Sequence, residues 1–203
     1  MQKVNYQIEL ENTINGIVSN GERPSLLLQS CCGPCSSYVL EYLTRYFDIT
    51  VLYYNPNIYP PEEYEKRLSV QKRLISELPR ENDIRIMECD YEPELFSDAV
   101  KGLENEPEGG RRCEVCFRLR LEKTAQLAKE NGFDFFGTTL TVSPHKNAQL
   151  INVIGLELGE KYGIRFLASD FKKKNGYKRS VELSEKYGLY RQNYCGCRFS
   201  LNK

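Results

Sequence analysis

Short apolar runs alternate along the chain with longer amphipathic stretches. The apolar runs are rich in β-branched and aromatic residues, and they predict five strands, at Ser25–Gln29, Ile49–Tyr54, Ile84–Met87, Phe133–Thr138 and Ile164–Ala168. This alternation is typical of a parallel sheet whose strands are joined by crossover helices. We therefore expect an α/β fold with an open, mainly parallel, five-stranded sheet.

Helical patterns fill the intervals between these strands. They predict helices at Pro34–Tyr46, Pro61–Leu78, Glu92–Gly102, Val115–Asn131 and Ser143–Tyr162. The last of these helices is expected to open on a serine N-cap followed by a proline, both favoured at a helix start.

The two ends of the chain complete the expected organisation. A further amphipathic helix at about Tyr6–Ser19, within the N-terminal segment 1–24, is expected to pack across one edge of the sheet. The C-terminal segment 171–203 is basic, carries two cysteines and is expected to complete the functional site. No linker, repeat or low-complexity tract interrupts the sequence, so we expect a single α/β domain over residues 1–203.

Chemically distinctive residues follow the ends of the predicted strands. In strand order they are Cys31-Cys32, Asn55-Pro56-Asn57, Cys89-Asp90-Tyr91, Ser143-Pro144-His145-Lys146 and Asp170-Phe171-Lys172. Open α/β sheets bind ligands outside the carboxyl ends of their strands. The sequence therefore predicts one active site at one rim of the sheet.

The cysteine content is unusual for the protein class that the composition indicates. The chain has 203 residues, a formal net charge of zero, eight cysteines and one histidine. No apolar run approaches the roughly 18 residues of a membrane span, and the polar N-terminus resembles neither a signal nor a transit peptide. We therefore expect a cytoplasmic protein without a membrane partner, where cysteines favour metal or redox chemistry over structural disulfides.

Seven cysteines form three groups with ligand-like spacing. The groups are Cys31-Cys32-Gly33-Pro34-Cys35, Cys113-Glu114-Val115-Cys116 and Cys195-Gly196-Cys197. The first lies between a strand and a helix, where free N–H groups and the helix dipole favour thiolates. Burial of both adjacent cysteines in one core is disfavoured because their side chains point opposite ways in an extended segment. We expect the seven thiols in one site, and we interpret Cys89 as structural.

The number of thiols favours an iron–sulfur centre over zinc. A tetrahedral zinc site would use four cysteines and leave three unexplained, and a site with two histidines is impossible with His145 alone. A [4Fe–4S] cluster takes four thiolates, or three when one iron stays open. The remaining thiols would form a redox dithiol, or bind a second metal together with Asp170 or Asp90.

A basic strip lies near the C-terminus of an otherwise neutral chain. Five basic residues occupy ten positions, namely Lys172, Lys173, Lys174, Lys178 and Arg179. Such a strip is typical either of a solvated loop or of a surface that contacts a polyanion such as RNA. Lys146 is a stronger anion-binding candidate than its neighbour His145, because the dipole at the predicted helix start would keep His145 neutral.

Tyrosines could supply stacking surfaces for bases, or they could pack at half-buried positions. The candidates are Tyr53, Tyr54, Tyr59, Tyr64, Tyr190 and Tyr194.

Seven segments of the chain together resemble the QueH-type epoxyqueuosine reductases. In order they read CCGPCSS, YYNPNIYPPEEYEKR, CDYEPE, RCEVCFRLRLEKTA, TTLTVSPHKN, SDFKKKNGYKRS and YRQNYCGC. The resemblance spans Ser25 to Arg198 and implies reduction of an epoxide on the modified wobble base of tRNA, with an iron–sulfur cluster and without cobalamin. The implied fold resembles the adenine-nucleotide hydrolase-like group (HUP, or PP-loop). The SGGxDS phosphate loop of that group is absent at Cys31–Ser37, which argues against ATP use.

The resemblance leads to a hypothesis for the role of each residue. Cys113 and Cys116, with Cys31 or Cys32, would hold a [4Fe–4S] cluster. The catalytic set would be Cys32, Cys35, Cys195, Cys197, Asp170 and Asp90, forming a redox site or holding a second mononuclear iron. Phosphates of tRNA would be held by Lys172, Lys173, Lys174, Arg179 and Arg191.

Electrons would come from an external donor such as a ferredoxin or flavodoxin. Two rival interpretations remain, an iron–sulfur-dependent tRNA thiolation enzyme that needs ATP and a zinc-stabilised RNA-binding module.

Overall fold

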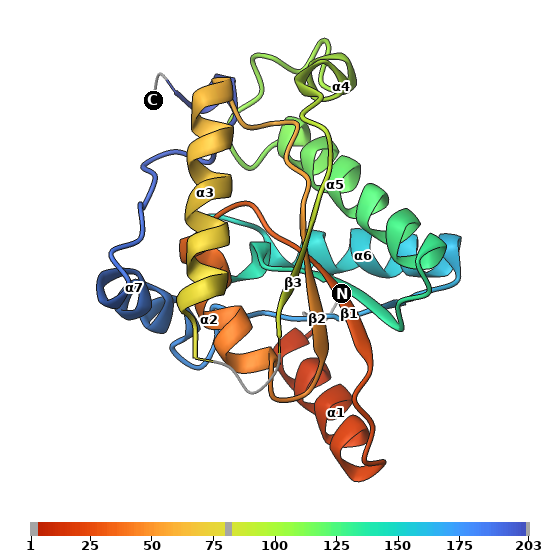
Figure 1. Cartoon of the computed structure of the whole chain (residues 1–203). Coiled ribbons are helices and arrows are strands. Elements are labelled where there is room, and N and C mark those ends of the chain that lie inside the picture. Colours follow the sequence, from red (N-terminus) through yellow and green to blue (C-terminus); the bar gives the residue numbers. More distant parts are fainter. Residues whose placement is uncertain (1–3, 80–82, 202–203) are drawn as a thin grey trace.

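Five parallel strands form one open sheet in the order β3-β2-β1-β4-β5 (Figure 1). Their bounds are β1 Ser25–Gln29, β2 Asp48–Tyr53, β3 Arg85–Glu88, β4 Phe135–Thr138 and β5 Arg165–Phe166. Every pairing is parallel, which confirms the predicted α/β fold. The computed structural model describes residues 4–79 and 83–201. Residues 1–3 of the predicted N-terminal segment and 202–203 of the C-terminal segment lie outside the described residues.

Helices cover both faces of this sheet. Their bounds are α1 Tyr6–Ser19, α2 Gly33–Leu43, α3 Pro61–Glu77, α4 Pro93–Ala99, α5 Arg111–Glu130, α6 Ala148–Tyr162 and α7 Gly176–Lys186. Leu26 and Leu28 of β1 pack in a core with α1, α2 and α3, whereas Leu27 packs in a second core with α5 and α6. Alternate residues of the central strand thus bury opposite faces. None of the described helices is long and apolar enough to cross a bilayer.

The predicted helix start at Ser143 is wrong. The chain forms a short 3₁₀ segment, η1 at Leu140–Val142, and then a turn in which the Ser143 hydroxyl accepts the N–H of His145 at 3.3 Å. Helix α6 begins only at Ala148, because the Asn147 side chain accepts the N–H of Leu150 at 3.2 Å and so provides the N-cap. His145 therefore precedes the helix.

Two other differences affect the candidate site. Helix α5 begins at Arg111 rather than Val115, so Cys113 and Cys116 lie within its first turns. Helix α7 was not predicted, because its residues lie in a strongly basic stretch and three of its buried positions are Gly176, Ser180 and Ser184. This helix packs against α2.

Strand β5 is shorter than predicted; Leu167 still donates to the Phe136 carbonyl of β4 at 2.8 Å, and beyond it the chain bonds to a side chain of α6. The Asn152 amide accepts the N–H of Ser169 and donates to its carbonyl, both at 2.8 Å. Asp170 follows directly after this point.

Replacing Asn147 tests the corrected start of α6. Asn147→Ala should lower the free energy of unfolding by about 1 kcal/mol, because it removes the N-cap acceptor. The matched control, Ser143→Ala, should cost less than about 0.5 kcal/mol, as is usual for a surface change. Urea unfolding of protein samples with equal metal content measures both values. A larger cost at Ser143 than at Asn147 would contradict the assignment.

Candidate functional site

The first cysteine group lies where β1 passes into α2. Cys32 is the N-cap residue of α2, and Pro34 occupies its first turn. The sulfur atoms of Cys31, Cys32 and Cys35 all lie within 4.8 Å of one another, a spacing that could hold a metal ion. A Cβ atom at Gly33 would lie 2.9 Å from Val70 of α3, so this close approach requires glycine.

The second cysteine group occupies the N-terminal turns of α5. Cys113 and Cys116 are three positions apart and therefore lie on the same side of the helix. The N–H of Gly109 donates to the Cys113 sulfur at 3.2 Å. Gly109 itself has a positive φ of 87°, which reverses the chain just before the helix.

The third cysteine group is held in place by a buried arginine of α3. Arg67 is 1 % exposed; it pairs with Glu63 at 2.7 Å and donates to the carbonyls of Cys195 at 3.2 Å and Tyr194 at 3.4 Å. Gly196 has φ 102°, and a Cβ there would lie 3.0 Å from the Arg67 guanidinium. The glycine thus allows the CxC turn to lie directly against this cation.

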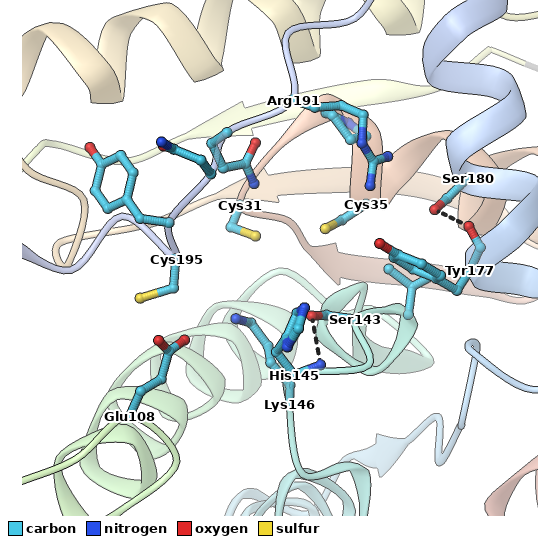
Figure 2. A pocket seen from close by; sticks show the side chains of 15 residues that line it. Cys31, Cys35, Glu108, Ser143, His145, Lys146, Tyr177, Ser180, Arg191 and Cys195 are labelled. Atoms are coloured by element: carbon cyan, nitrogen blue, oxygen red, sulfur yellow. Dashed lines mark hydrogen bonds between the residues drawn. The ribbon is translucent and has the colours of Figure 1, made fainter. Parts of the chain in front are cut away.

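Two adjoining cavities bring the three groups together. The main cavity, about 620 Å³, is lined in part by Cys31, Cys35 and Cys195. The inner chamber, about 30 Å³, is lined by Cys113, Cys116, Cys195 and Cys197 among others. Cys195 lines both, and Figure 2 shows its sulfur on the same side of the main cavity as Glu108.

The two remaining cysteines, Cys32 and Cys89, line neither cavity. Cys32 is buried and accepts a hydrogen bond from the Gln192 amide at 3.1 Å, while Gln192 itself lines the main cavity. Cys89 lines neither cavity; it packs half-buried beside the core that contains α5. Six of the seven cysteines that the sequence grouped thus line these cavities and Cys32 lies beside them, whereas Cys89 lines neither.

The thiols differ strongly in acidity. Hydrogen bonds from Cys32 and Cys35 hold the pKa of Cys31 well below its usual range, and the charges of Lys146 and Arg120 act in the same direction. The bond to Cys31 raises the pKa of Cys32 to about 12, and bonds to both neighbours raise the pKa of Cys35. The predicted lowering of the pKa thus applies to Cys31 and not to Cys32 or Cys35, and its main cause is hydrogen bonding between the thiols.

The pKa values of the two CxC thiols also shift in opposite directions. A hydrogen bond from Cys197 lowers the pKa of Cys195 to about 4, and the charge of Lys146 contributes although burial opposes it. The same bond raises the pKa of Cys197. Cys31 and Cys195 are therefore the members of their groups whose pKa is lowered, and both line the main cavity.

Neither predicted carboxylate lines the main cavity or the inner chamber. Asp170 forms an ion pair with Lys172 at 2.6 Å and lines a separate side cavity of about 380 Å³. Asp90 is exposed at the end of β3. Glu108 lines both cysteine-bearing cavities. The sequence analysis missed it because it lies in the turn before α5 and not after a strand, although its position beside the CxxC motif was a usable signal.

The predicted RNA-binding residues fall into two sets. Lys172 and Lys173 line the side cavity, and Arg191 lines the main cavity. Lys174 pairs with Glu11 of α1, and Arg179 pairs with Glu41 at 2.7 Å and Glu182 at 3.1 Å. The charges of the second set are therefore neutralised within the chain.

Three of the six candidate stacking tyrosines are core residues. Tyr53, Tyr54 and Tyr64 are at most 3 % exposed. Tyr194 does line the main cavity, as does Tyr177, which the sequence analysis did not select. The Arg191 guanidinium lies 5.9 Å from the centre of the Tyr177 ring.

Comparison with known proteins identifies the family. The family model described as "Epoxyqueuosine reductase QueH" matches residues 26–203. The chain is 50 % identical over 198 residues to "Epoxyqueuosine reductase QueH" of Streptococcus pyogenes serotype M1, which covers 97 % of this chain and 78 % of that relative. The protein of the same name from Thermotoga maritima is 39 % identical over 183 residues, covering 87 % of this chain and 90 % of the relative.

Among solved structures, the chain is similar to the enzyme WbmH of Bordetella bronchiseptica, crystallised with NAD⁺. The similarity covers 70 % of this chain and 53 % of that one, at 14 % identity and a TM-score of 0.34. The family assignment rests on the sequence matches, which extend from β1 to the C-terminal cysteines. The chain belongs to the epoxyqueuosine reductase QueH family.

Proposed function

We propose that this chain reduces the epoxide of epoxyqueuosine at the wobble position of tRNA to the alkene of queuosine, at an iron–sulfur cluster held by its cysteines. The observation that supports this most strongly is the gathering of seven thiols from three stretches of the chain around two adjoining cavities. The family names supply the substrate, and the thiols supply the ligand set.

The charges around the thiols fit an anionic sulfur centre. Arg120 is 3 % exposed, and the negative groups that act on its charge are Cys116, Cys31 and Cys195. No carboxylate within the described ranges forms an ion pair with Arg120 or Lys146. A buried charge is costly unless an opposite charge compensates it. Iron-bound thiolates would provide that compensation.

The cysteines divide between two roles. We assign Cys31, Cys32, Cys113 and Cys116 to the [4Fe–4S] cluster, which supplies electrons one at a time when bound.

The remaining thiols are Cys35, Cys195 and Cys197, which would hold a second mononuclear iron or act as a redox dithiol. The carboxylate role predicted for Asp170 or Asp90 fits Glu108 better, because Glu108 lines the cavities that contain these thiols.

The main cavity would take the modified nucleoside after its extrusion from the tRNA stem-loop. Tyr177 and Tyr194 provide aromatic surfaces in its wall. Lys173 and Arg191 are the members of the predicted basic set that would meet phosphates, since Lys172, Lys174 and Arg179 are already paired with carboxylates. An external one-electron carrier such as a ferredoxin or flavodoxin would supply the electrons.

Conversion of the modified nucleoside tests this function directly. Anaerobically reconstituted protein should be brown and contain about four or five irons per chain, from one cluster and an optional extra iron. With a strong reductant and tRNA bearing epoxyqueuosine, nucleoside mass analysis should show queuosine. A colourless protein that binds only zinc, or unchanged epoxyqueuosine with full iron content, would disprove the proposal.

Replacing a CxxC cysteine should remove both the cluster and the activity. Cys113→Ser should abolish the iron–sulfur absorbance, because serine lacks the thiolate that binds iron. Cys89→Ser is the matched control, since Cys89 lies outside both cavities, and it should retain most of the iron and the activity. Iron analysis and nucleoside assays measure both variants. Equal damage at Cys89 and Cys113 would show that the division of the cysteines is wrong.

A further inference from the structure

Lys146 lies where three cavities meet. It lines the main cavity, the inner chamber and the side cavity. Its position is fixed by the turn before α6, where its N–H donates to the Ser143 carbonyl at 3.3 Å and the next residue, Asn147, caps the helix. Figure 2 shows its side chain rising into the space between Cys31 and Cys195.

The ammonium group of Lys146 acts on all three cysteine groups. Its charge favours the thiolate form of Cys31, of Cys116 and of Cys195. Its side chain forms no ion pair or hydrogen bond with another side chain in the part of the chain that the structure describes. The three N–H donors of this cation are therefore available to a ligand.

Other cations near the thiols are placed differently. Arg112 and Arg120 line the inner chamber only, and Arg191 lines the main cavity only. Of the described lysines and arginines, Lys146 alone lines both of these cavities. A substrate in the main cavity would thus meet the Lys146 ammonium in the space that Cys31, Cys35 and Cys195 also line.

Loss of the epoxide oxygen requires such a group. The overall step breaks both C–O bonds, forms a C=C bond, and adds two electrons from an external one-electron donor and two protons from solvent to the oxygen, which leaves as water. Negative charge gathers on the oxygen as each C–O bond breaks. A preorganised N–H donor in a site shielded from water stabilises such a charge more than water does.

We propose that Lys146 binds the oxygen atom that leaves the epoxide, with its Nζ–H group donating a hydrogen bond to that oxygen while the C–O bonds break. This assignment rests on the proposed function of the chain. It gives Lys146 a role in the reaction itself, beyond compensating the charge of the sulfur centre.

Replacement and chemical rescue of Lys146 test this role. Lys146→Ala should lower kcat by about 10²- to 10³-fold, the usual effect of removing one such donor. Its iron content and the affinity of the metal-free protein for the tRNA should stay within about twofold of wild type, because other residues bind the metal and the phosphates. Lys146→Arg, which keeps a cationic N–H donor, should retain part of the activity.

Rescue with small cations distinguishes the effect of the Lys146 hydrogen bond from the effect of its charge. Added propylammonium should restore activity to Lys146→Ala in a saturable manner, whereas tetramethylammonium, which carries the charge without an N–H, should not. Lys129→Ala is the control for loss of a lysine, because Lys129 lies at the far end of α5 and donates to the Gly163 carbonyl at 3.2 Å. It should keep the wild-type kcat.

Three results would overturn the role of Lys146. These are a wild-type kcat in Lys146→Ala, equal rescue by both cations, or a loss of iron that accounts for the loss of activity. A wild-type protein that holds iron yet converts no epoxyqueuosine would overturn the proposed function as well. Conversion by wild type together with unimpaired Lys146→Ala would overturn the lysine assignment alone.

Discussion

Two positive charges, on the buried Arg120 and the half-buried Lys146, lie among cysteine thiols without an ion pair to any described carboxylate. Burial of a cation is unfavourable unless negative charge lies close by. The negative groups that act on both charges are the sulfurs of Cys31 and Cys195, and Glu108 lines the same two cavities. The arrangement therefore favours an anionic sulfur centre, and the surrounding fold brings the thiols and the cations to the same place.

The fold achieves this by joining distant segments at one rim of the sheet. The end of β1 supplies the first cysteine group, and the N-terminal turns of α5 supply the second. The third group depends on a long-range contact, because Arg67 of α3, which is paired with Glu63, donates to the carbonyls of Tyr194 and Cys195. Removing Glu63 or Arg67 would leave the other charge buried without a partner. The ion pair therefore holds Arg67 in place, and the hydrogen bonds from Arg67 fix the position of the C-terminal segment.

The sequence was sufficient to predict the sheet and the rim at which the site lies. It was not sufficient to predict the directions in which side chains point. Strand patterns predicted all five strands because each lies in a short, largely apolar run, and the strand-end rule placed Cys31 at the rim. That rule could not show that Asp170 turns toward Lys172, or that Glu108 reaches the thiols from a turn before a helix. Nor could it distinguish core tyrosines such as Tyr53 from cavity residues such as Tyr177, because both are aromatic.

Locating the iron is the most direct test of this account. Crystals of the reconstituted protein, measured with X-rays near the iron absorption edge, would give anomalous density at the metal. We expect strong density between Cys31 and the CxxC pair of α5, next to Arg120 and Lys146. Iron bound outside these cavities, or a site that contains only zinc beside uncompensated Arg120 and Lys146, would contradict the central claim.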